Sequence, residues 1–333
     1  MTEQELQALA DEIADRIRAG GGQAFRAGGR RQAAAGGRRQ AAGGSAAALP
    51  PVRGALALTP DPVTAAEIAW RGPVQTAAWS PAQGARRVAD FVDHTLLKPE
   101  ATREEIVKLC AEARQHRFAA VCVNGTWVEL CVKELRGVEV AVASVVGFPL
   151  GAMTRRAKAF EAREAAGLGA REVDMVAAIG RIKGGQWACV EDDIRAVVEA
   201  AHPAIVKVII ESALLTPEEI IKVSALAKEA GAHFVKTSTG FHAAGGASVE
   251  AVRLMRLVVG DDLGVKASGG VRDCQTALAM IAAGANRIGT SSGVAFVTCL
   301  GPGPLPLAEL LKQPHAHGAT CTSGTCQSAG GQY

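Results

Sequence analysis

The sequence is poor in aromatic residues and has no long apolar run. Aromatic residues make up 4% of its 333 residues, and no apolar stretch reaches the ~20 residues that a transmembrane helix requires. Aliphatic residues and alanine therefore supply most of the 48% hydrophobic fraction. That balance is typical of α/β proteins, in which strands rich in valine and isoleucine are covered by alanine-rich helices. We expect an α/β protein with no membrane contact.

Acidic residues are absent between Arg16 and Arg53, a segment that contains eight arginines. The formal net charge of +3 therefore comes from this segment, and the rest of the chain has an excess of acids. Apart from Phe25, no aromatic residue lies between these arginines, so the segment lacks the pattern of a single-stranded nucleic-acid binding site. We expect neither a nucleic-acid nor a membrane partner.

The pattern of a secretory leader is missing too, and the cysteines do not form a disulfide framework. The first 19 residues contain five acids, where a leader would have a basic region and then an apolar one. The eight cysteines are scattered, and six of them fall in expected helices and strands. We therefore expect a reduced, cytoplasmic protein without a metal. The C-terminal tail is a weaker alternative for a metal site, because its Gly/Ser/Thr-rich surroundings provide no core. Its candidate ligands are His315, His317, Cys321 and Cys326.

Composition divides the chain into five regions. Residues 1–19 have the spacing of a short amphipathic helix. Residues 20–53 are mostly Gly, Ala, Arg and Gln and cannot bury enough surface to offset their ordering entropy, so we expect a flexible, mostly disordered linker. Residues 54–87 form a lead-in segment, residues 88–312 carry a regular pattern of strands and helices, and residues 313–333 form a flexible tail.

From residue 88 onward, short β-rich runs alternate with helical stretches, which indicates βα units around a parallel sheet. We expect strands at 88–93, 119–123, 139–146, 171–176, 205–210, 233–237, 264–267 and 286–289. We expect helices between them, for example at 103–115, 154–167 and 217–230. Eight such units in about 220 residues match a (β/α)8 TIM barrel. A doubly wound open sheet is the alternative, but it would need a Gly-x-Gly-x-x-Gly turn where Asp93-His94-Thr95 stands.

Charged residues collect toward the ends of four strands, where barrels of this kind hold their catalytic groups. Asp93 ends the first strand, and Asp174 lies near the end of the fourth. Lys236 and Lys266 lie near the ends of the sixth and seventh. A buried lysine beside a second cation has a lowered pKa, and its neutral amine can attack a carbonyl to form an iminium. We expect Lys236 to be such a nucleophile, perturbed by Lys266, with Asp174 as a proton shuttle through water. By spacing alone, lysines paired with carboxylates at strand ends are an equally good interpretation.

Two loops rich in glycine and hydroxyl groups follow the last two strands. They are Ser268-Gly269-Gly270 and Gly289-Thr290-Ser291-Ser292. Glycines permit close approach of the backbone, and a helix N-terminus with hydroxyls offers donors to an anion. Because barrels often hold a phosphate at these loops, we expect a phosphorylated substrate there, with simple turns as the alternative.

Eight motifs run in order along residues 88–312. They are DHTLLKPEAT (93–102), VCVN (121–124), VVGFPLGAMT (145–154), EVDMV (172–176), KVIIE (207–211), VKTSTGF (235–241), VKASGGVR (265–272) and GTSSG (289–293). Together they resemble the deoxyribose-phosphate aldolase family. The resemblance implies a class I aldolase that reversibly cleaves 2-deoxy-D-ribose 5-phosphate to D-glyceraldehyde 3-phosphate and acetaldehyde. It implies no metal or organic cofactor, because the iminium is the electron sink, and it implies a homodimer.

The resemblance also implies a role for each matching residue. Lys236 corresponds to the Schiff-base lysine and Lys266 to the lysine that perturbs it. Asp174 corresponds to the proton-relay aspartate, and Asp93 to the aspartate that supports the lysine pair. Cys122 matches a pocket cysteine that aldehyde products can modify. The remaining substrate-binding residues implied by the match are Thr237, Gly269, Gly270, Gly289, Ser291 and Ser292.

The chain departs from the family after Phe241. The family usually has Gly-x-Gly-Gly-Ala-Thr there, whereas this chain has a run one residue longer, from His242 to Ser248. The EVDMV motif usually continues with Ile-Asn, and here it continues with Ala177-Ala178. These differences put the substrate affinity or range in doubt. Some members place a C-terminal tyrosine in the active site, and this chain ends in its only tyrosine, Tyr333.

Residues 2–19 lie outside this resemblance and are similar to the encapsulation peptides of bacterial microcompartment cargo. The apolar stripe of the expected helix consists of Leu6, Leu9, Ile13 and Ile17. A shell or cargo protein would bind such a stripe, and a shell would retain acetaldehyde. Localisation inside a microcompartment is therefore the favoured expectation, and an oligomerisation or solubility helix is the alternative.

Two further functions stay open from the sequence. The barrel could be a Schiff-base aldolase or transaldolase that acts on another phosphorylated sugar. It could instead be a catalytically inactive barrel that serves as a microcompartment interaction module.

Overall fold

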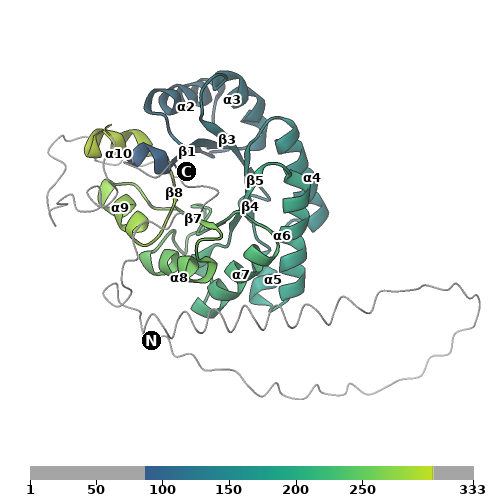
Figure 1. Cartoon of the computed structure of the whole chain (residues 1–333). Coiled ribbons are helices and arrows are strands. Elements are labelled where there is room, and N and C mark those ends of the chain that lie inside the picture. Colours follow the sequence, from purple (N-terminus) through teal and green to yellow (C-terminus); the bar gives the residue numbers. More distant parts are fainter. Residues whose placement is uncertain (1–86, 302, 304–333) are drawn as a thin grey trace, which may run out of the picture.

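The protein forms a closed, all-parallel barrel surrounded by helices (Figure 1). The structure is a computed structural model that describes residues 87–301 and 303. Its strands pair in chain order from β1 to β8, and β8 pairs with β1 to close the sheet. The expected (β/α)8 TIM barrel is confirmed. The expected helix at 2–19, the linker at 20–53, nearly all of the lead-in segment at 54–87 and the tail at 313–333 lie outside the described residues.

The strands are short runs of valine, isoleucine and alanine that are buried on both faces, as parallel strands under helices must be. Their bounds are β1 Val92–Leu96, β2 Ala120–Val123, β3 Ala141–Val146, β4 Glu172–Val176, β5 Ile205–Ile209, β6 Phe234–Lys236, β7 Gly264–Ser268 and β8 Arg287–Thr290. Seven of the eight expected strands overlap these elements and differ by at most two residues at either end.

The strand expected at 88–93 is wrong in its first four residues. Val88–Phe91 forms a 3₁₀ helix (η1), and β1 begins only at Val92. Asp90 explains the difference, because its side chain accepts hydrogen bonds from the backbone N–H and the guanidinium of Arg87 and so closes a turn. Val88, Ala89 and Phe91 are all buried, as residues of a strand covered on both faces would be, so their apolar character does not distinguish this turn from a strand.

Five of the nine α-helices of the described residues, α2, α4, α7, α8 and α9, begin at a side chain that caps the helix. Their bounds are α2 Arg103–His116, α3 Val128–Glu134, α4 Arg155–Gly167, α5 Ile179–Lys183, α6 Trp187–Ala201, α7 Pro217–Glu229, α8 Val249–Val259, α9 Cys274–Ala282 and α10 Gly293–Leu300, with 3₁₀ turns η2 Gly125–Trp127 and η3 Ser212–Leu214. A capping box of Thr102 and Glu105 starts α2, and one of Thr216 and Glu219 starts α7. No helix among the described residues has the length and apolar character to cross a membrane.

Successive strand residues face opposite sides of the barrel wall, and the two sides differ in chemistry. On β4, Val173 and Met175 belong to the large apolar core between strands and helices, whereas Asp174 belongs to the interior. A smaller apolar cluster inside the barrel consists of Leu97, Cys122, Ala143 and Val145. The rest of the interior includes several charged groups, an arrangement that calls for a function because buried charges are costly unless paired.

Candidate active site

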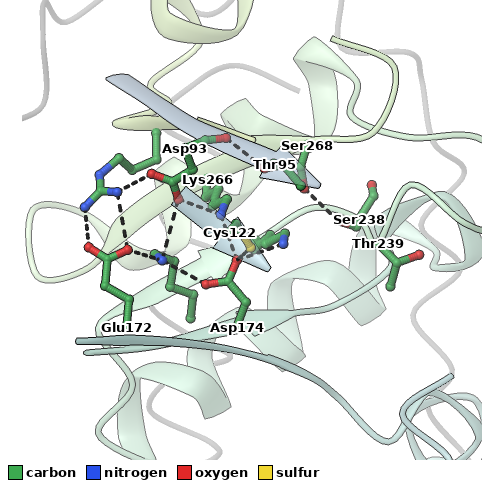
Figure 2. A network of polar contacts seen from close by, with 12 residues as sticks. Asp93, Thr95, Cys122, Glu172, Asp174, Ser238, Thr239, Lys266 and Ser268 are labelled. Carbon is green, nitrogen blue, oxygen red and sulfur yellow. Dashed lines mark hydrogen bonds and ion pairs between the residues drawn. The ribbon is translucent and has the colours of Figure 1, made fainter. Parts of the chain in front are cut away.

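Seven charged side chains form a connected network inside the barrel (Figure 2). They are Asp93 on β1, Glu172 and Asp174 on β4, Lys207 on β5, Lys236 on β6, Lys266 on β7 and Arg287 on β8. All are buried except Arg287, whose side chain is 13% exposed. The structure therefore brings together the four charged residues expected from the sequence and adds three that sequence reasoning did not single out.

Asp174 is the centre of the network. Its Oδ2 accepts hydrogen bonds from Lys236 Nζ at 2.8 Å and from Lys266 Nζ at 2.7 Å. Its Oδ1 accepts one from Lys207 Nζ at 2.8 Å. The strand register explains the meeting of the two lysines on Oδ2, because Lys236 on β6 is paired directly with Lys266 on β7. Asp174 therefore contacts the candidate nucleophile directly, whereas the sequence suggested an action through water.

Asp93 does not end β1 as expected but is its second residue. The strand continues to Leu96 because Asp93 through Leu96 pair with β2. Asp174 and Lys266 likewise lie in the middle of their strands, and only Lys236 ends one. The charged groups thus fill the interior of the barrel, and Lys236 stands nearest to the loops at the C-terminal ends of the strands.

Asp93 provides the second carboxylate that contacts Lys266. Its Oδ2 lies 2.6 Å from Lys266 Nζ and 3.6 Å from Lys207 Nζ. Its Oδ1 accepts a hydrogen bond from the guanidinium of Arg287. Lys266 is therefore held by two carboxylates. In the described part of the chain, Asp174 is the one carboxylate with which Lys236 forms an ion pair.

This difference in partners separates the two lysines electrostatically. Burial lowers the pKa of Lys236, the charge of Lys266 lowers it further, and Asp174 opposes both effects. Burial also disfavours the charged form of Lys266, but Asp174 and Asp93 outweigh it and raise its pKa. Burial would raise the pKa of Asp174, yet Lys207, Lys236 and Lys266 hold it well below its usual range. The arrangement favours a neutral amine at Lys236 beside a permanent cation at Lys266.

Glu172, Lys207 and Arg287 are the members of the network that the sequence did not reveal. Lys207 Nζ lies 2.5 Å from Glu172 Oε2, and Arg287 Nη2 donates to Glu172 Oε1 at 2.6 Å. A signal did exist for Glu172, because it precedes Asp174 by two residues on one strand and must face the same side. Among the described residues, no group of three His, Cys, Asp or Glu side chains could hold a metal ion. The carboxylates of the network are instead engaged in ion pairs with lysine and arginine.

Cys122 and Thr237 lie next to this network. Cys122 is fully buried, and its Sγ lies 4.0 Å from Asp174 Oδ2. Burial raises the pKa of this thiol. Thr237 Oγ1 donates to the carbonyl of Ser268 at 3.1 Å and accepts from its backbone N–H at 3.0 Å. These two hydrogen bonds of Thr237 join β6 to β7. The neighbouring hydroxyl of Ser238 is buried and has no hydrogen-bond partner among the described residues.

The loop after β7 contains two glycines in a left-handed backbone conformation, and the loop after β8 carries two serines. Gly269 and Gly270 both have φ near +80°, a conformation that side chains rarely adopt. Ser291 is exposed, and Ser292 is half-buried directly before α10. The backbone N–H of Ser292 donates to Thr290 Oγ1 at 2.9 Å.

Gly289 packs closely against Lys266 and Ser268. A Cβ atom there would lie 2.9 Å from Ser268 Cβ and 3.0 Å from Lys266 Cε. The missing side chain therefore leaves room for the lysine, independently of any contact with a substrate.

Residues 87–297 match the family model described as DeoC/LacD family aldolase. The deoxyribose-phosphate aldolase of Clostridium tetani is 56% identical over 211 residues, which cover 63% of this chain and 97% of that protein. The deoxyribose-phosphate aldolase of Streptococcus sanguinis is 57% identical over 207 residues, with coverages of 62% and 94%.

Solved structures agree with this match. The aldolase QR15 has a TM-score of 0.61 and 39% identity, and the alignment covers 63% of this chain and 94% of that one. The deoxyribose phosphate aldolase of Aeropyrum pernix, a tetramer, has a TM-score of 0.59 and 32% identity, with coverages of 63% and 89%. With a closed parallel barrel, a lysine pair on one carboxylate and a family match over most of the described residues, the chain belongs to the DeoC/LacD family of aldolases.

Proposed function

We propose that this protein is a class I deoxyribose-phosphate aldolase that cleaves 2-deoxy-D-ribose 5-phosphate to D-glyceraldehyde 3-phosphate and acetaldehyde through a Schiff base on Lys236. The observation that carries the proposal is the shared carboxylate oxygen, Asp174 Oδ2, which contacts the amines of both Lys236 and Lys266. Two ammonium groups on one oxygen repel each other, and the amine with fewer carboxylates loses its proton more easily.

Lys236 is the amine best placed to meet a substrate. Its side chain keeps 3% exposure, whereas those of Lys207 and Lys266 have none. It is also the lysine of the three whose pKa is lowered, because the pKa values of the other two are raised. A neutral amine attacks the aldehyde carbon of the open-chain sugar, and loss of water from the carbinolamine leaves an iminium.

The iminium takes up the electron pair when the sugar is cleaved. A base removes the proton of the C3 hydroxyl, the bond between C2 and C3 breaks, and its electron pair forms an enamine on the C1–C2 fragment. Glyceraldehyde 3-phosphate leaves with C3 as its aldehyde carbon. A proton then adds to C2, and water hydrolyses the iminium to release acetaldehyde and restore the amine.

Asp174 and Lys266 assist these proton transfers, and they carry opposite charges. Asp174 remains a carboxylate through its three lysine contacts and can accept a proton near Lys236. Lys266 remains a cation between Asp174 and Asp93. Asp93 therefore acts on the reaction through Lys266.

The phosphate of the substrate is assigned to the loops after β7 and β8. Gly269 and Gly270 both have positive φ and carry no side chain that would separate their backbone from a ligand, and Gly270 is exposed. Ser291 and Ser292 add hydroxyl groups at the start of α10. Ser238 is a further candidate, because its buried hydroxyl lacks a partner among the described residues and a sugar hydroxyl or a phosphate could supply one.

Reductive trapping tests the Schiff base. Incubation with acetaldehyde and borohydride should add one ethyl group to Lys236, located by peptide mass spectrometry, and Lys236→Met should abolish the labelling. A folded wild-type protein that takes up no label would contradict the proposal. Turnover in a coupled assay on deoxyribose 5-phosphate then tests the substrate.

Another phosphorylated sugar is the second candidate substrate, and the loop after β6 motivates it. Gly246, within the lengthened run from His242 to Ser248, lies against Gly269: a Cβ at Gly246 would lie 2.1 Å from the carbonyl oxygen of Gly269. The same assay with ribose 5-phosphate and fructose 6-phosphate decides between the candidates. If either sugar is turned over faster than deoxyribose 5-phosphate, that sugar is the substrate and the proposal for deoxyribose 5-phosphate is wrong.

Three further predictions belong to the same proposal. Residues 2–19 direct the enzyme to a microcompartment shell or cargo protein, Tyr333 assists proton transfer, and the enzyme works as a homodimer. Fusion of residues 1–50 to a fluorescent protein tests targeting, and a fusion that stays outside a shell would contradict it. Truncation of Tyr333 and a solution mass measurement test the other two.

A further inference from the structure

The charged groups of the barrel interior form one chain of contacts that runs away from Lys236. Lys207 joins Asp174 to Glu172, with its Nζ 2.8 Å from Asp174 Oδ1 and 2.5 Å from Glu172 Oε2. Arg287 then joins Glu172 to Asp93. Figure 2 shows Asp93, Glu172, Asp174 and Lys266 bound into this one network.

Glu172 and Arg287 lie at the far end of this chain from the reaction. They are the first residues of β4 and β8, whereas Lys236 is the last residue of β6. Arg287 lines two depressions at the N-terminal end of the barrel, opposite the loops assigned to the substrate. Neither residue is therefore placed to touch the sugar.

The charges of the network balance only when Lys236 is neutral. The anions are Asp93, Glu172 and Asp174, and the permanent cations are Lys207, Lys266 and Arg287. A proton on Lys236 would leave one excess positive charge in a region from which water is nearly excluded. An uncompensated buried charge is costly, so the balance favours loss of that proton.

Within the described residues, no ion pair links Lys236 to a charged group outside this network of seven. Asp174 on β4 and Lys266 on β7 contact its amine, and the thiol of Cys122 on β2 lies beside Asp174. Lys207, Arg287, Asp93 and Glu172 complete the charged groups from β5, β8, β1 and β4. The two buried β3 residues of the interior cluster, Ala143 and Val145, are apolar.

We propose that Glu172 and Arg287 are positioning residues that set the net charge of the barrel interior and thereby keep the amine of Lys236 neutral. This inference rests on the proposed function, since it assumes that Lys236 is the nucleophile. Glu172 and Arg287 act through Lys207, Asp93 and Asp174 by fixing which groups hold protons. Their opposite charges give them opposite effects on Lys236.

The test is the pH dependence of acetaldehyde labelling, measured by intact mass with cyanoborohydride as reductant and expressed relative to wild type. Arg287→Met leaves one excess negative charge, so the labelling inflection moves to higher pH. Glu172→Gln leaves one excess positive charge, so it moves to lower pH. Each shift should be roughly one pH unit, which is the effect of a unit charge at a distance of about 10 Å and an effective dielectric constant of about 20. The double variant restores the balance and returns the inflection close to the wild-type value.

Two controls separate charge balance from simple structural support. Arg287→Lys keeps the charge with a poorer fit and should keep the inflection. Glu139→Gln removes an exposed carboxylate that lines the same depressions and should change nothing. The proposal is overturned if both single variants slow labelling without moving its inflection pH. It is also overturned if the inflection of the double variant lies further from the wild-type value than that of either single variant. Wild type that is never labelled would instead overturn the function of Lys236. If Arg287→Met fails to fold, Glu172→Gln alone must still shift the inflection downward.

Discussion

Lys236 and Lys266 share a single oxygen atom, Oδ2 of Asp174, at 2.8 and 2.7 Å. Lys266 has a second carboxylate oxygen, Asp93 Oδ2, at 2.6 Å. Two adjacent amines that compete for one carboxylate do not hold their protons equally, and the one with the additional anion keeps its proton. A symmetric pair of residue types thus becomes an asymmetric pair of chemical groups, a cation and a nucleophile.

Replacement of Lys266 tests this asymmetry. In Lys266→Met, the amine of Lys236 loses its cationic neighbour and has Asp174 Oδ2 to itself, so its pKa rises and it is mostly protonated at neutral pH. We expect kcat/KM at pH 7 to fall by roughly 100-fold or more, with partial recovery at higher pH. Lys266→Arg keeps the charge and should keep the pH dependence. An equal loss at every pH would mean that Lys266 acts in some way other than on the charge of Lys236.

The wild-type enzyme should gain activity with rising pH at values where an ordinary lysine is still protonated. The pKa of Lys236 is lowered by burial and by Lys266, and the neutral, reactive form exists above that pKa. The raised pKa of Lys266 keeps it charged over the same range. A profile of kcat/KM against pH reports the free enzyme, so its rising limb should lie below the usual lysine pKa of about 10.4. A rising limb at that value would show that Lys236 is unperturbed.

Much of the fold could be predicted from the sequence because local and global signals agree. Runs of valine and isoleucine mark β3 and β5, and the Thr-x-x-Glu boxes at Thr102 and Thr216 mark the starts of α2 and α7. The one misplaced strand start depends on a side-chain contact, Arg87 with Asp90. That contact favours a 3₁₀ turn over residues 88–91, where the hydrophobic pattern alone favours a strand.

The site was predicted less completely, for a geometric reason. Asp174 and Lys236 belong to motifs, but Arg287 looks like the unremarkable start of a strand. Its side chain reaches Asp93, 194 residues away in the chain, only because the barrel closes between β8 and β1. Contacts made by closure have no local signature. The same holds for Gly246 against Gly269, which join two loops.

That loop contact gives a prediction for the phosphate site. In Gly246→Ala, the new methyl group would lie 2.1 Å from the carbonyl oxygen of Gly269, so the Gly269-Gly270 turn must move. We expect KM for deoxyribose 5-phosphate to rise about tenfold, the size of one lost charge-assisted hydrogen bond. Labelling of Lys236 by acetaldehyde, which has no phosphate, should stay within about twofold. Ala243→Ser, an exposed change in the same loop, is the control. Equal losses in both assays would mean that the turn supports the barrel and not the phosphate.

The last prediction concerns stability and a buried arginine outside the charged network. Arg256 on α8 donates from Nη1 to the carbonyl of Leu263 at 2.7 Å, and from Nε and Nη2 to that of Gly284 at 3.1 and 2.9 Å. It therefore holds the turns that lead into β7 and β8. Burial lowers its pKa to about 10, so it remains charged at neutral pH.

Arg256→Met removes these donors and leaves buried carbonyl groups without partners, which should lower the unfolding free energy by roughly 3–5 kcal/mol. Urea denaturation followed by circular dichroism measures the change. Arg253→Met on the same helix is the matched control, because Nη1 of Arg253 is buried and has no hydrogen-bond partner within the part of the chain that the structure describes. Its removal should alter stability by no more than about 1 kcal/mol, since it leaves no acceptor unsatisfied. If both variants lose the same stability, the bulk of the side chain on α8 matters and the carbonyl contacts of Arg256 do not.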